Sequence, residues 1–317
     1  MTFENNFTIP EIHSFEQIVA KAETMVNASG KPKTALVAPT ASDSLKAFVL
    51  AMDKNLIEPY LIGDEVFIKA KAEQNGINLE KAKFINIIEP DSAVLTASKM
   101  SLERELDLII KGHISTVPFL KSLFKEKDFF DKKNKLISHV AVIKPALYEK
   151  LLFLTDAAVN IAPDLKGKLS LVNNAVKVAK IVGIEMPRVA LLAAVEVIYP
   201  QMPVTMDAAI ISKMAERKQI KGAYVDGPLS FDVAVDMVAA HSKGIKDSPV
   251  AGQADILLAP NLETANGVYK AMTLFGNAQI GGIVYGGKVP IVLSSRSDSI
   301  ENQFNAIALG ALTACFQ

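Results

Sequence analysis

Four short segments place hydroxyl, amide or charged side chains directly after an apolar run, where a strand would end. The densest is Ser294-Ser-Arg-Ser-Asp-Ser299, which precedes a helical pattern. Hydroxyls and backbone N–H groups at a helix start attract anions, and the planar guanidinium of Arg296 can meet two phosphate oxygens. The segment therefore indicates an anion site. An ordinary helix cap by Asp298 or Ser299, with Arg296 in solvent, explains the pattern equally well.

The second segment is Asp226-Gly227-Pro228, after the apolar residues 223–225. We expect a strand to deliver Asp226 into a Gly-Pro turn, where the glycine would let a ligand approach the backbone closely. A plain strand-to-helix turn capped by Ser230 or Asp232 is the simpler interpretation.

The third segment follows a strand that stops at Pro260. We expect Asn266 and Gly267 to lie before a helix that bears Tyr269 and Lys270, where they could meet a phosphate or an amide of a cofactor. The alternative is a capped helix with Lys270 exposed to solvent.

The fourth segment contains Lys111, His113 and Ser115, between an expected strand and an expected helix. A lysine and a histidine beside small hydroxyls could hold an anion. For a lone histidine such as His113, however, a structural role is the more common one.

Several other kinds of site are not expected. The spacing Gly282 to Lys288 matches the start of a phosphate loop, but Val289 stands where a magnesium-binding hydroxyl is needed, and no G-x-G-x-x-G fingerprint occurs. The four histidines, His13, His113, His139 and His241, have no metal-binding spacing. The single cysteine, Cys315, lies in an apolar helical stretch and is expected to fill the core.

Alternating strand and helix patterns must position these segments. Apolar runs typical of strands covered on both faces recur along the chain, at 34–39, 59–62, 106–110, 188–194, 223–225, 255–258 and 290–293. Segments with helical periodicity separate them, for example Ser42 to about Lys54. This alternation predicts an α/β fold with largely parallel strands, in which ligands bind beyond the carboxyl ends of the strands. The charged stretch 124–135 is expected to be an exposed connection or a domain edge.

Composition excludes several functional classes. Lys plus Arg and Asp plus Glu both number 34, so the chain lacks the basic excess of a dedicated nucleic-acid binder. No apolar run approaches the roughly 20 residues of a membrane span, and the first residues do not resemble a signal peptide. One cysteine suits a reducing compartment, so we expect a cytoplasmic protein.

Taken together, six ordered segments resemble the phosphate acetyl/butyryltransferase family. They are Asp156-Ala-Ala-Val-Asn160, Pro187-Arg-Val-Ala-Leu-Leu192, Val225-Asp-Gly-Pro-Leu229, Ala254-Asp-Ile-Leu-Leu-Ala-Pro260, Asn266-Gly-Val-Tyr-Lys270 and Leu293-Ser-Ser-Arg-Ser-Asp-Ser299. The variant Ser-Arg-Ser-Asp-Ser, with Ala194-Val-Glu-Val197 upstream, looks more like the butyryl branch than the acetyl branch.

The resemblance implies two Rossmann-like α/β domains of three layers, as in isocitrate and isopropylmalate dehydrogenases, with the active site in a cleft between them. The first domain would contain residues 1–140 and 288–317, and the second residues 141–287. The implied reaction interconverts a short-chain acyl-CoA plus phosphate with acyl phosphate plus CoA. The implied partners are these substrates and, in a homodimer or larger assembly, further copies of the chain; no tightly bound cofactor or metal is implied.

The resemblance also assigns residues. It implies catalytic roles for Ser295 and Arg296. The segments described above supply the candidates for substrate binding, which are Lys111, His113, Ser115, Asp226, Gly227, Pro228, Asn266 and Lys270. In the acetyl branch an Asp in the next helical turn is the proposed base, and Asn302 stands at that position here, with Glu301 beside it. Asp298 is the nearest substitute for the base.

Three alternatives remain open at this point. Acetyl-CoA could be the substrate instead of butyryl-CoA. The missing Asp could mark a non-catalytic CoA-binding protein. A decarboxylating dehydrogenase shares a related architecture, but its metal needs clustered Asp residues that the sequence does not supply.

Overall fold

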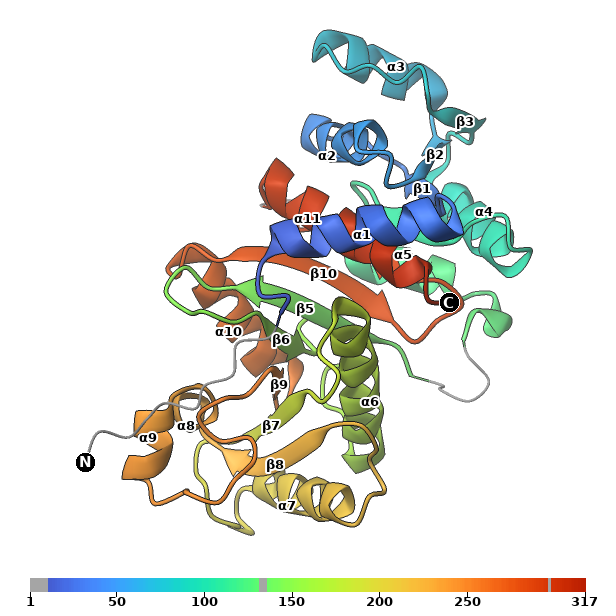
Figure 1. Ribbon diagram of the computed structural model, residues 1–317. Coiled ribbons are helices and arrows are strands. Elements are labelled where there is room, and N and C mark those ends of the chain that lie inside the picture. The colour runs from blue at the N-terminus through green and yellow to red at the C-terminus, as the bar shows by residue number, and fades with distance from the viewer. Residues whose placement is uncertain (1–10, 131–135, 296–297) are drawn as a thin grey trace. The chain divides into compact units, whose positions relative to one another are not determined.

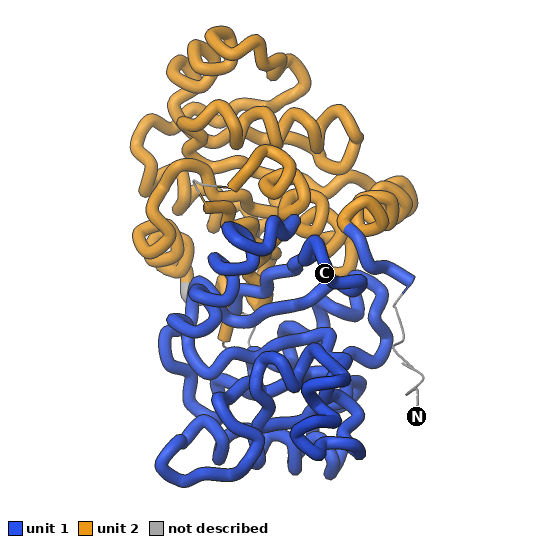
Figure 2. Tube along the Cα trace, turned by 90° about the vertical axis from the view of Figure 1, so that its left-hand side faces the viewer, with its two compact units in different colours: residues 1–14, 138–279 blue, residues 15–137, 280–317 orange. Residues whose placement is uncertain are grey.

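The computed structural model describes residues 11–130, 136–295 and 298–317 and shows a mixed α/β chain (Figure 1). The chain forms two compact units (Figure 2). Unit 1 contains residues 138–279 together with the N-terminal residues up to Ser14, and unit 2 contains residues 15–137 and 280–317.

Among its described residues, unit 2 carries strands in the order β3-β2-β1-β4-β11-β10. Its strands are β1 (Lys33–Val37), β2 (Glu58–Gly63), β3 (Lys83–Asn86), β4 (Leu108–Lys111), β10 (Gln279–Tyr285) and β11 (Ile291–Val292). All neighbours are parallel except β10, which runs antiparallel to β11. Its helices are α1 (Phe15–Ser29), α2 (Ser42–Asp53), α3 (Glu65–Gln74), α4 (Pro90–Leu102), α5 (Thr116–Leu123), the 3₁₀ turn η1 (Lys127–Phe129) and α11 (Ile300–Ala314).

In the part of unit 1 that the structure describes, the strands follow the order β5-β6-β9-β7-β8. The strands are β5 (Ser138–Lys144), β6 (Leu152–Thr155), β7 (Arg188–Leu192), β8 (Tyr224–Leu229) and β9 (Ile256–Leu258). β5 is antiparallel to β6, and the other neighbours are parallel. The helices are α6 (Leu165–Val182), α7 (Pro203–Glu216), α8 (Phe231–Val235), α9 (Met237–Ser242) and α10 (Leu262–Leu274).

The predicted α/β fold with largely parallel strands is confirmed. Every residue of β4, β6 and β9 is buried, as expected for strands covered on both faces. In unit 2, α11 packs against both α1 and α2. Eight residues in its second half, from Ala306 to Thr313, are all buried, so this helix belongs to the core.

The compact units divide the chain between residues 137 and 138 and between 279 and 280, whereas the sequence analysis placed the boundaries at 140 and 288. The difference at the second boundary has a simple cause. β10 pairs with β11 through Ile283 and Val284, so nearly all of it belongs with unit 2. The charged stretch 124–135 ends close to the first boundary. It is not wholly exposed, because the Phe129 side chain is completely buried.

Candidate functional site

The polar segments of unit 2 follow the carboxyl ends of neighbouring strands, and we call this side of the sheet its carboxyl edge. β4 lies between β1 and β11, with Lys111 opposite Val37 and Ile110 opposite Val292. All three strands run in the same direction, so the segments that follow them start side by side. These segments begin at Ala38, at Gly112 and at Leu293, and such an edge is where ligands bind in α/β folds.

Lys111 is the buried cation of this edge. It is 5% exposed, and its Nζ donates hydrogen bonds to the carbonyl oxygens of Gly112 and Ile114, each at 3.1 Å. The ammonium group therefore holds the loop that leads to α5. A Cβ on Gly112 would collide with the carbonyl oxygens of Val37 and Ala38, so the loop can follow this path only with glycine at that position.

The other two candidates of this loop are exposed. The backbone N–H of His113 donates to the carbonyl oxygen of Ala38 at 3.2 Å, which leaves the side chain on the surface. Ser115 is the N-cap residue of α5, and its hydroxyl makes no capping hydrogen bond.

Beyond β11, Ser295 and Asp298 are joined by two hydrogen bonds. The N–H of Ser295 donates to Oδ2 of Asp298 at 2.6 Å, and the N–H of Asp298 donates to the carbonyl oxygen of Ser295 at 3.1 Å. Ser299 is the N-cap of α11, since its hydroxyl accepts the N–H of Asn302 at 3.1 Å. The cap expected at Asp298 or Ser299 is thus made by Ser299. Arg296, with its neighbour Ser297, lies outside the described residues.

Two side chains of α11 tie this turn to the rest of unit 2. Oδ1 of Asn302 accepts the backbone N–H of Ile280 at 3.0 Å, which joins α11 to the start of β10. Nε2 of Gln303, a residue only 6% exposed, donates to the carbonyl oxygen of Asp298 at 3.0 Å. Gln303 was missed by the sequence analysis, although an amide on the apolar face of a helix is a signal of a specific partner.

In unit 1, Asp226 does not end its strand. β8 continues through the cis peptide Gly227–Pro228 as far as Leu229, so the expected Gly-Pro turn after the strand is wrong. Oδ1 of Asp226 accepts the N–H of Gly227 at 2.8 Å, and Oδ2 accepts the hydroxyl of Ser248. A Cβ on Gly227 would collide with Leu191 of β7, which explains the glycine by close packing within the sheet.

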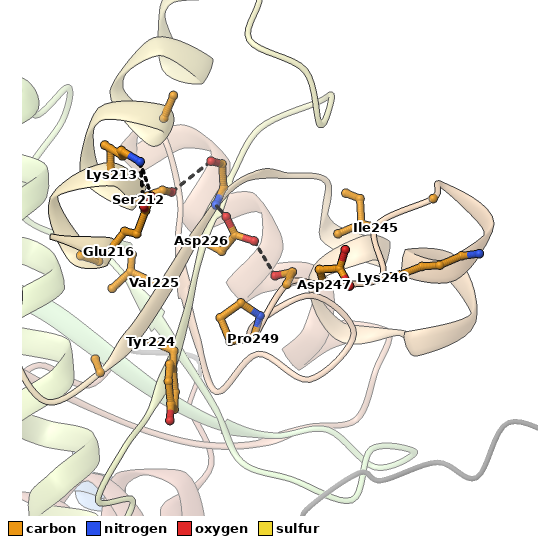
Figure 3. Close-up of a pocket in the computed structure, with 16 residues that line it drawn as sticks. Ser212, Lys213, Glu216, Tyr224, Val225, Asp226, Ile245, Lys246, Asp247 and Pro249 are labelled. Carbon is orange, nitrogen blue, oxygen red and sulfur yellow. Dashed lines mark hydrogen bonds and ion pairs between the residues drawn. The ribbon is translucent and has the colours of Figure 1, made fainter. Parts of the chain in front are cut away.

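Asp226 lines an open pocket of about 680 Å³ between α7, β8 and the loop 244–249 (Figure 3). Several of its polar side chains are bonded to neighbouring residues. Lys213 pairs with Glu216 at 2.6 Å, and the hydroxyl of Ser212 donates to the carbonyl oxygen of Gly227 at 3.0 Å. This pocket lies along the outermost strand of unit 1.

Asn266 and Lys270 both lie within α10. This helix begins at Leu262 and is capped by Asn261, which accepts the N–H of Thr264 at 2.9 Å. The expectation that Asn266 lies in a loop before the helix is therefore wrong. Its Nδ2 donates to the carbonyl oxygen of Ala157 at 3.1 Å, and Lys270 is exposed. The structure does not bring these residues to Asp226, because β7 separates β8 from β9, the strand that leads to α10.

Asp156 is a buried carboxylate at the carboxyl end of β6. It is 2% exposed and accepts the backbone N–H groups of His139, Ala158, Val159 and Asn160, together with Nδ2 of Asn160. These bonds fold the segment after β6 around one carboxylate. The segment was part of the family resemblance, but the sequence did not indicate this role.

His139 is the buried histidine beside Asp156. Burial lowers the pKa of its imidazole, and the negative charge of Asp156 acts in the opposite direction. The ring of Tyr269 lies edge-on to it, with 6.3 Å between ring centroids. The sequence pointed to His113 instead, because the residue type alone does not show whether a histidine such as His139 is buried.

Comparison with known proteins decides the family. A family model described as "Phosphate acetyl/butaryl transferase" matches residues 87–311, which is more than half of the chain. The chain belongs to this phosphate acetyl/butyryl transferase family. It is accordingly a phosphate acyltransferase, and the resemblance found in the sequence is confirmed.

Curated relatives of this acyltransferase carry both branch names. A phosphate butyryltransferase of Clostridium acetobutylicum is 42% identical over 303 residues, which cover 96% of this chain and 99% of that protein. A phosphate acetyltransferase of Rickettsia typhi is 41% identical over 271 residues, which cover 85% of this chain and 77% of that protein. A crystal structure of a branched-chain phosphotransacylase from Enterococcus faecalis covers 89% of this chain and 99% of its own, with 30% identity and a TM-score of 0.77.

Within residues 11–130, 136–295 and 298–317, no three or more His, Cys, Asp or Glu side chains gather as metal ligands would. In the same part of the chain, no helix has the length and apolar character needed to cross a bilayer.

Proposed function

We propose that this enzyme transfers a butyryl group, or an acyl group of similar size, between CoA and phosphate within a ternary complex. A phosphate oxygen attacks the thioester carbonyl carbon, the carbon–sulfur bond breaks, and the CoA thiolate leaves and takes up a proton. The observation that carries the proposal is the Ser295–Asp298 turn beside the Lys111 loop, in a chain of this family. Because phosphate is partly dianionic near neutral pH, it needs orientation more than deprotonation.

The proposed roles follow from the chemistry of each side chain. Arg296 would hold the phosphate oxygens and offset their charge, and Ser295 would donate a hydrogen bond to the developing oxyanion or the leaving sulfur. Lys111, His113 and Ser115 lie at the same strand edge and would contact the anionic substrates. Contacts of Asp226, Gly227, Pro228, Asn266 and Lys270 with acyl-CoA stay predictions.

Acyl-chain preference separates this proposal from its alternative, a phosphate acetyltransferase. The 42% and 41% identities to the two kinds of relative are too close to choose between them. The Ser-Arg-Ser-Asp-Ser variant favours the butyryl branch. We further propose a cytoplasmic homodimer or larger assembly, with CoA as a substrate and no tightly bound cofactor.

The reaction is tested by thiol release from acetyl-, propionyl- and butyryl-CoA, each with and without phosphate. We expect phosphate-dependent release of CoA that is fastest with butyryl-CoA. Fastest release from acetyl-CoA would move the enzyme to the acetyl branch. CoA binding without any release would support the non-catalytic alternative.

Asn302→Asp tests whether the enzyme lacks a base. The carboxylate can still accept the N–H of Ile280, so we expect the variant to fold normally. Because the Asn302 amide oxygen is occupied by β10, we expect the rate of acyl phosphate plus CoA to change by less than about tenfold, the effect of about 1.4 kcal/mol. A larger gain would mean that position 302 faces the CoA thiol.

Asn302→Ala is the matched control for this substitution. It leaves the N–H of Ile280, a residue 1% exposed, without its acceptor, at a cost of about 1–3 kcal/mol in unfolding free energy. Equal stability of the Asp and wild-type forms, with loss in the Ala form, would establish that the side chain at 302 is an acceptor for β10.

A further inference from the structure

The side chains of Asp298 and Gln303 both bond to the backbone at this end of β11, Asp298 to Ser295 and Gln303 to Asp298. We infer that Asp298 and Gln303 are positioning residues that fix the backbone of Ser295 for phosphate binding, and that Asp298 is not the base. This inference rests on the proposed function, because it assigns the residues that shape the same site.

The carboxylate of Asp298 bonds directly to the backbone of Ser295. Oδ2 accepts the Ser295 N–H at 2.6 Å, while the Asp298 N–H returns to the Ser295 carbonyl oxygen at 3.1 Å. A hydrogen bond from an amide to a charged carboxylate is among the stronger ones in proteins. A base must take up a proton during the reaction. Protonation of the Asp298 carboxylate would weaken its hydrogen bond to the Ser295 N–H during the reaction. Acting as the base therefore conflicts with holding Ser295 in place.

Asp298 is also not needed as the helix cap. Ser299 performs that function for α11 by accepting the Asn302 N–H at 3.1 Å. The carboxylate of Asp298 instead points back to residue 295. An aspartate that does not cap the helix but binds the backbone three residues earlier is placed to shape the loop.

Gln303 holds the backbone of Asp298. Its side chain is largely buried, and its Nε2 donates to the carbonyl oxygen of Asp298 at 3.0 Å. The backbone N–H of Gln303 donates to the carbonyl oxygen of Ser299 at 3.0 Å, as in a regular helix. The side chain therefore adds a second bond, to Asp298, beyond those of the helix. The hydrogen bond links Asp298 to the buried helix α11, and movement of the turn therefore requires breaking a buried contact.

The decisive experiment compares Asp298→Asn, Asp298→Ala and Gln303→Met in the full-length enzyme. An asparagine oxygen can still accept the Ser295 N–H but cannot act as a base. We expect Asp298→Asn to keep kcat/KM for phosphate within about tenfold of wild type, and Asp298→Ala to lose about tenfold to a hundredfold, as loss of a charged hydrogen bond predicts. The pH profile of Asp298→Asn should match that of wild type.

Gln303→Met keeps size and helix propensity and removes the amide group that carries the Nε2 donor. We expect it to raise KM for phosphate more than it lowers kcat, with an unchanged KM for butyryl-CoA. Thr313→Val is the control, since it removes a buried hydroxyl at the far end of α11, bonded to the Leu309 carbonyl at 2.7 Å. It should leave both constants unchanged.

Equal losses in Asp298→Asn and Asp298→Ala, with one limb of the pH profile missing, would identify Asp298 as the base and overturn the inference. A Gln303→Met enzyme that behaves like Thr313→Val would remove Gln303 from the site. Hydrogen–deuterium exchange of the peptide 293–300 tests positioning separately from turnover. Exchange should quicken in Asp298→Ala and Gln303→Met but not in Thr313→Val. Absence of that change contradicts the inference even if the wild-type protein proves inactive.

Discussion

Replacing Lys150 with methionine is expected to lower the free energy of unfolding of unit 1 by about 3–5 kcal/mol, because it leaves the carboxylate of Asp255 buried without its cation. Lys150 is 0% exposed and Asp255 is also fully buried. Nζ of Lys150 lies 2.5 Å from Oδ1 of Asp255 and donates to the carbonyl oxygen of Gln253 at 2.7 Å.

The position of this pair explains the size of the effect. Asp255 directly precedes β9, the strand between β6 and β7, and its Oδ2 accepts the backbone N–H of Arg188 at 2.8 Å. The pair therefore joins the starts of neighbouring strands in the middle of unit 1. Burial lowers the pKa of Lys150, while the charge and hydrogen bond of Asp255 act in the opposite direction. Without Lys150, the guanidinium of Arg188 is still near the Asp255 carboxylate, but its Nη1 lies 4.0 Å from Oδ2, so most of the cost of burying the charge remains.

Urea unfolding of unit 1 measures the effect, with the double variant Lys150→Met/Asp255→Asn as control. The asparagine oxygen keeps an acceptor for the Arg188 N–H, and neither charge remains in the core. We expect the double variant to recover most of the stability lost by Lys150→Met alone. If Lys150→Met alone were as stable as wild type, the carboxylate would have to be protonated or hydrated in the folded protein.

Much of the fold follows from local sequence. The apolar runs that predicted β1, β4, β7 and β9 are continuous because both faces of those strands are buried, and the second half of β2 is buried as well. β10 was missed because Gly281 and Gly282 weaken its strand pattern. The structure supplies the reason for Gly281: a Cβ there would meet the Phe15 ring at 2.9 Å and the Ala306 nitrogen at 3.1 Å. Such packing of distant segments is not visible in a local pattern.

The candidate site was predictable where it depended on strand ends, and not where it depended on tertiary contacts. The segments after β4 and β11 were found from their position after apolar runs, and the register places them at one edge. The functions of Asn302 and Gln303 depend on bonds to Ile280 and to the Asp298 carbonyl. Those bonds exist only once α11 has packed on the sheet. The family resemblance therefore suggested a missing base at 302, and the sequence indicated nothing at 303.

Replacing Arg296 with lysine is expected to lower kcat/KM for phosphate about a hundredfold, with KM for butyryl-CoA nearly unchanged. A guanidinium presents two parallel N–H donors to phosphate, whereas an ammonium group acts as a single point charge. Loss of one charge-assisted hydrogen bond costs about 1.5–3 kcal/mol, and about 1.4 kcal/mol is a factor of ten. The net charge is retained, so the change isolates geometry from charge.

Steady-state rates at varied phosphate, for Arg296→Lys and for the control Arg217→Lys, provide the measurement. Arg217 is exposed at the end of α7, in the other unit, so its substitution should change neither kcat nor KM. Wild-type phosphate affinity and turnover in Arg296→Lys would mean that another cation, with Lys111 at the same strand edge as the first candidate, binds the phosphate instead.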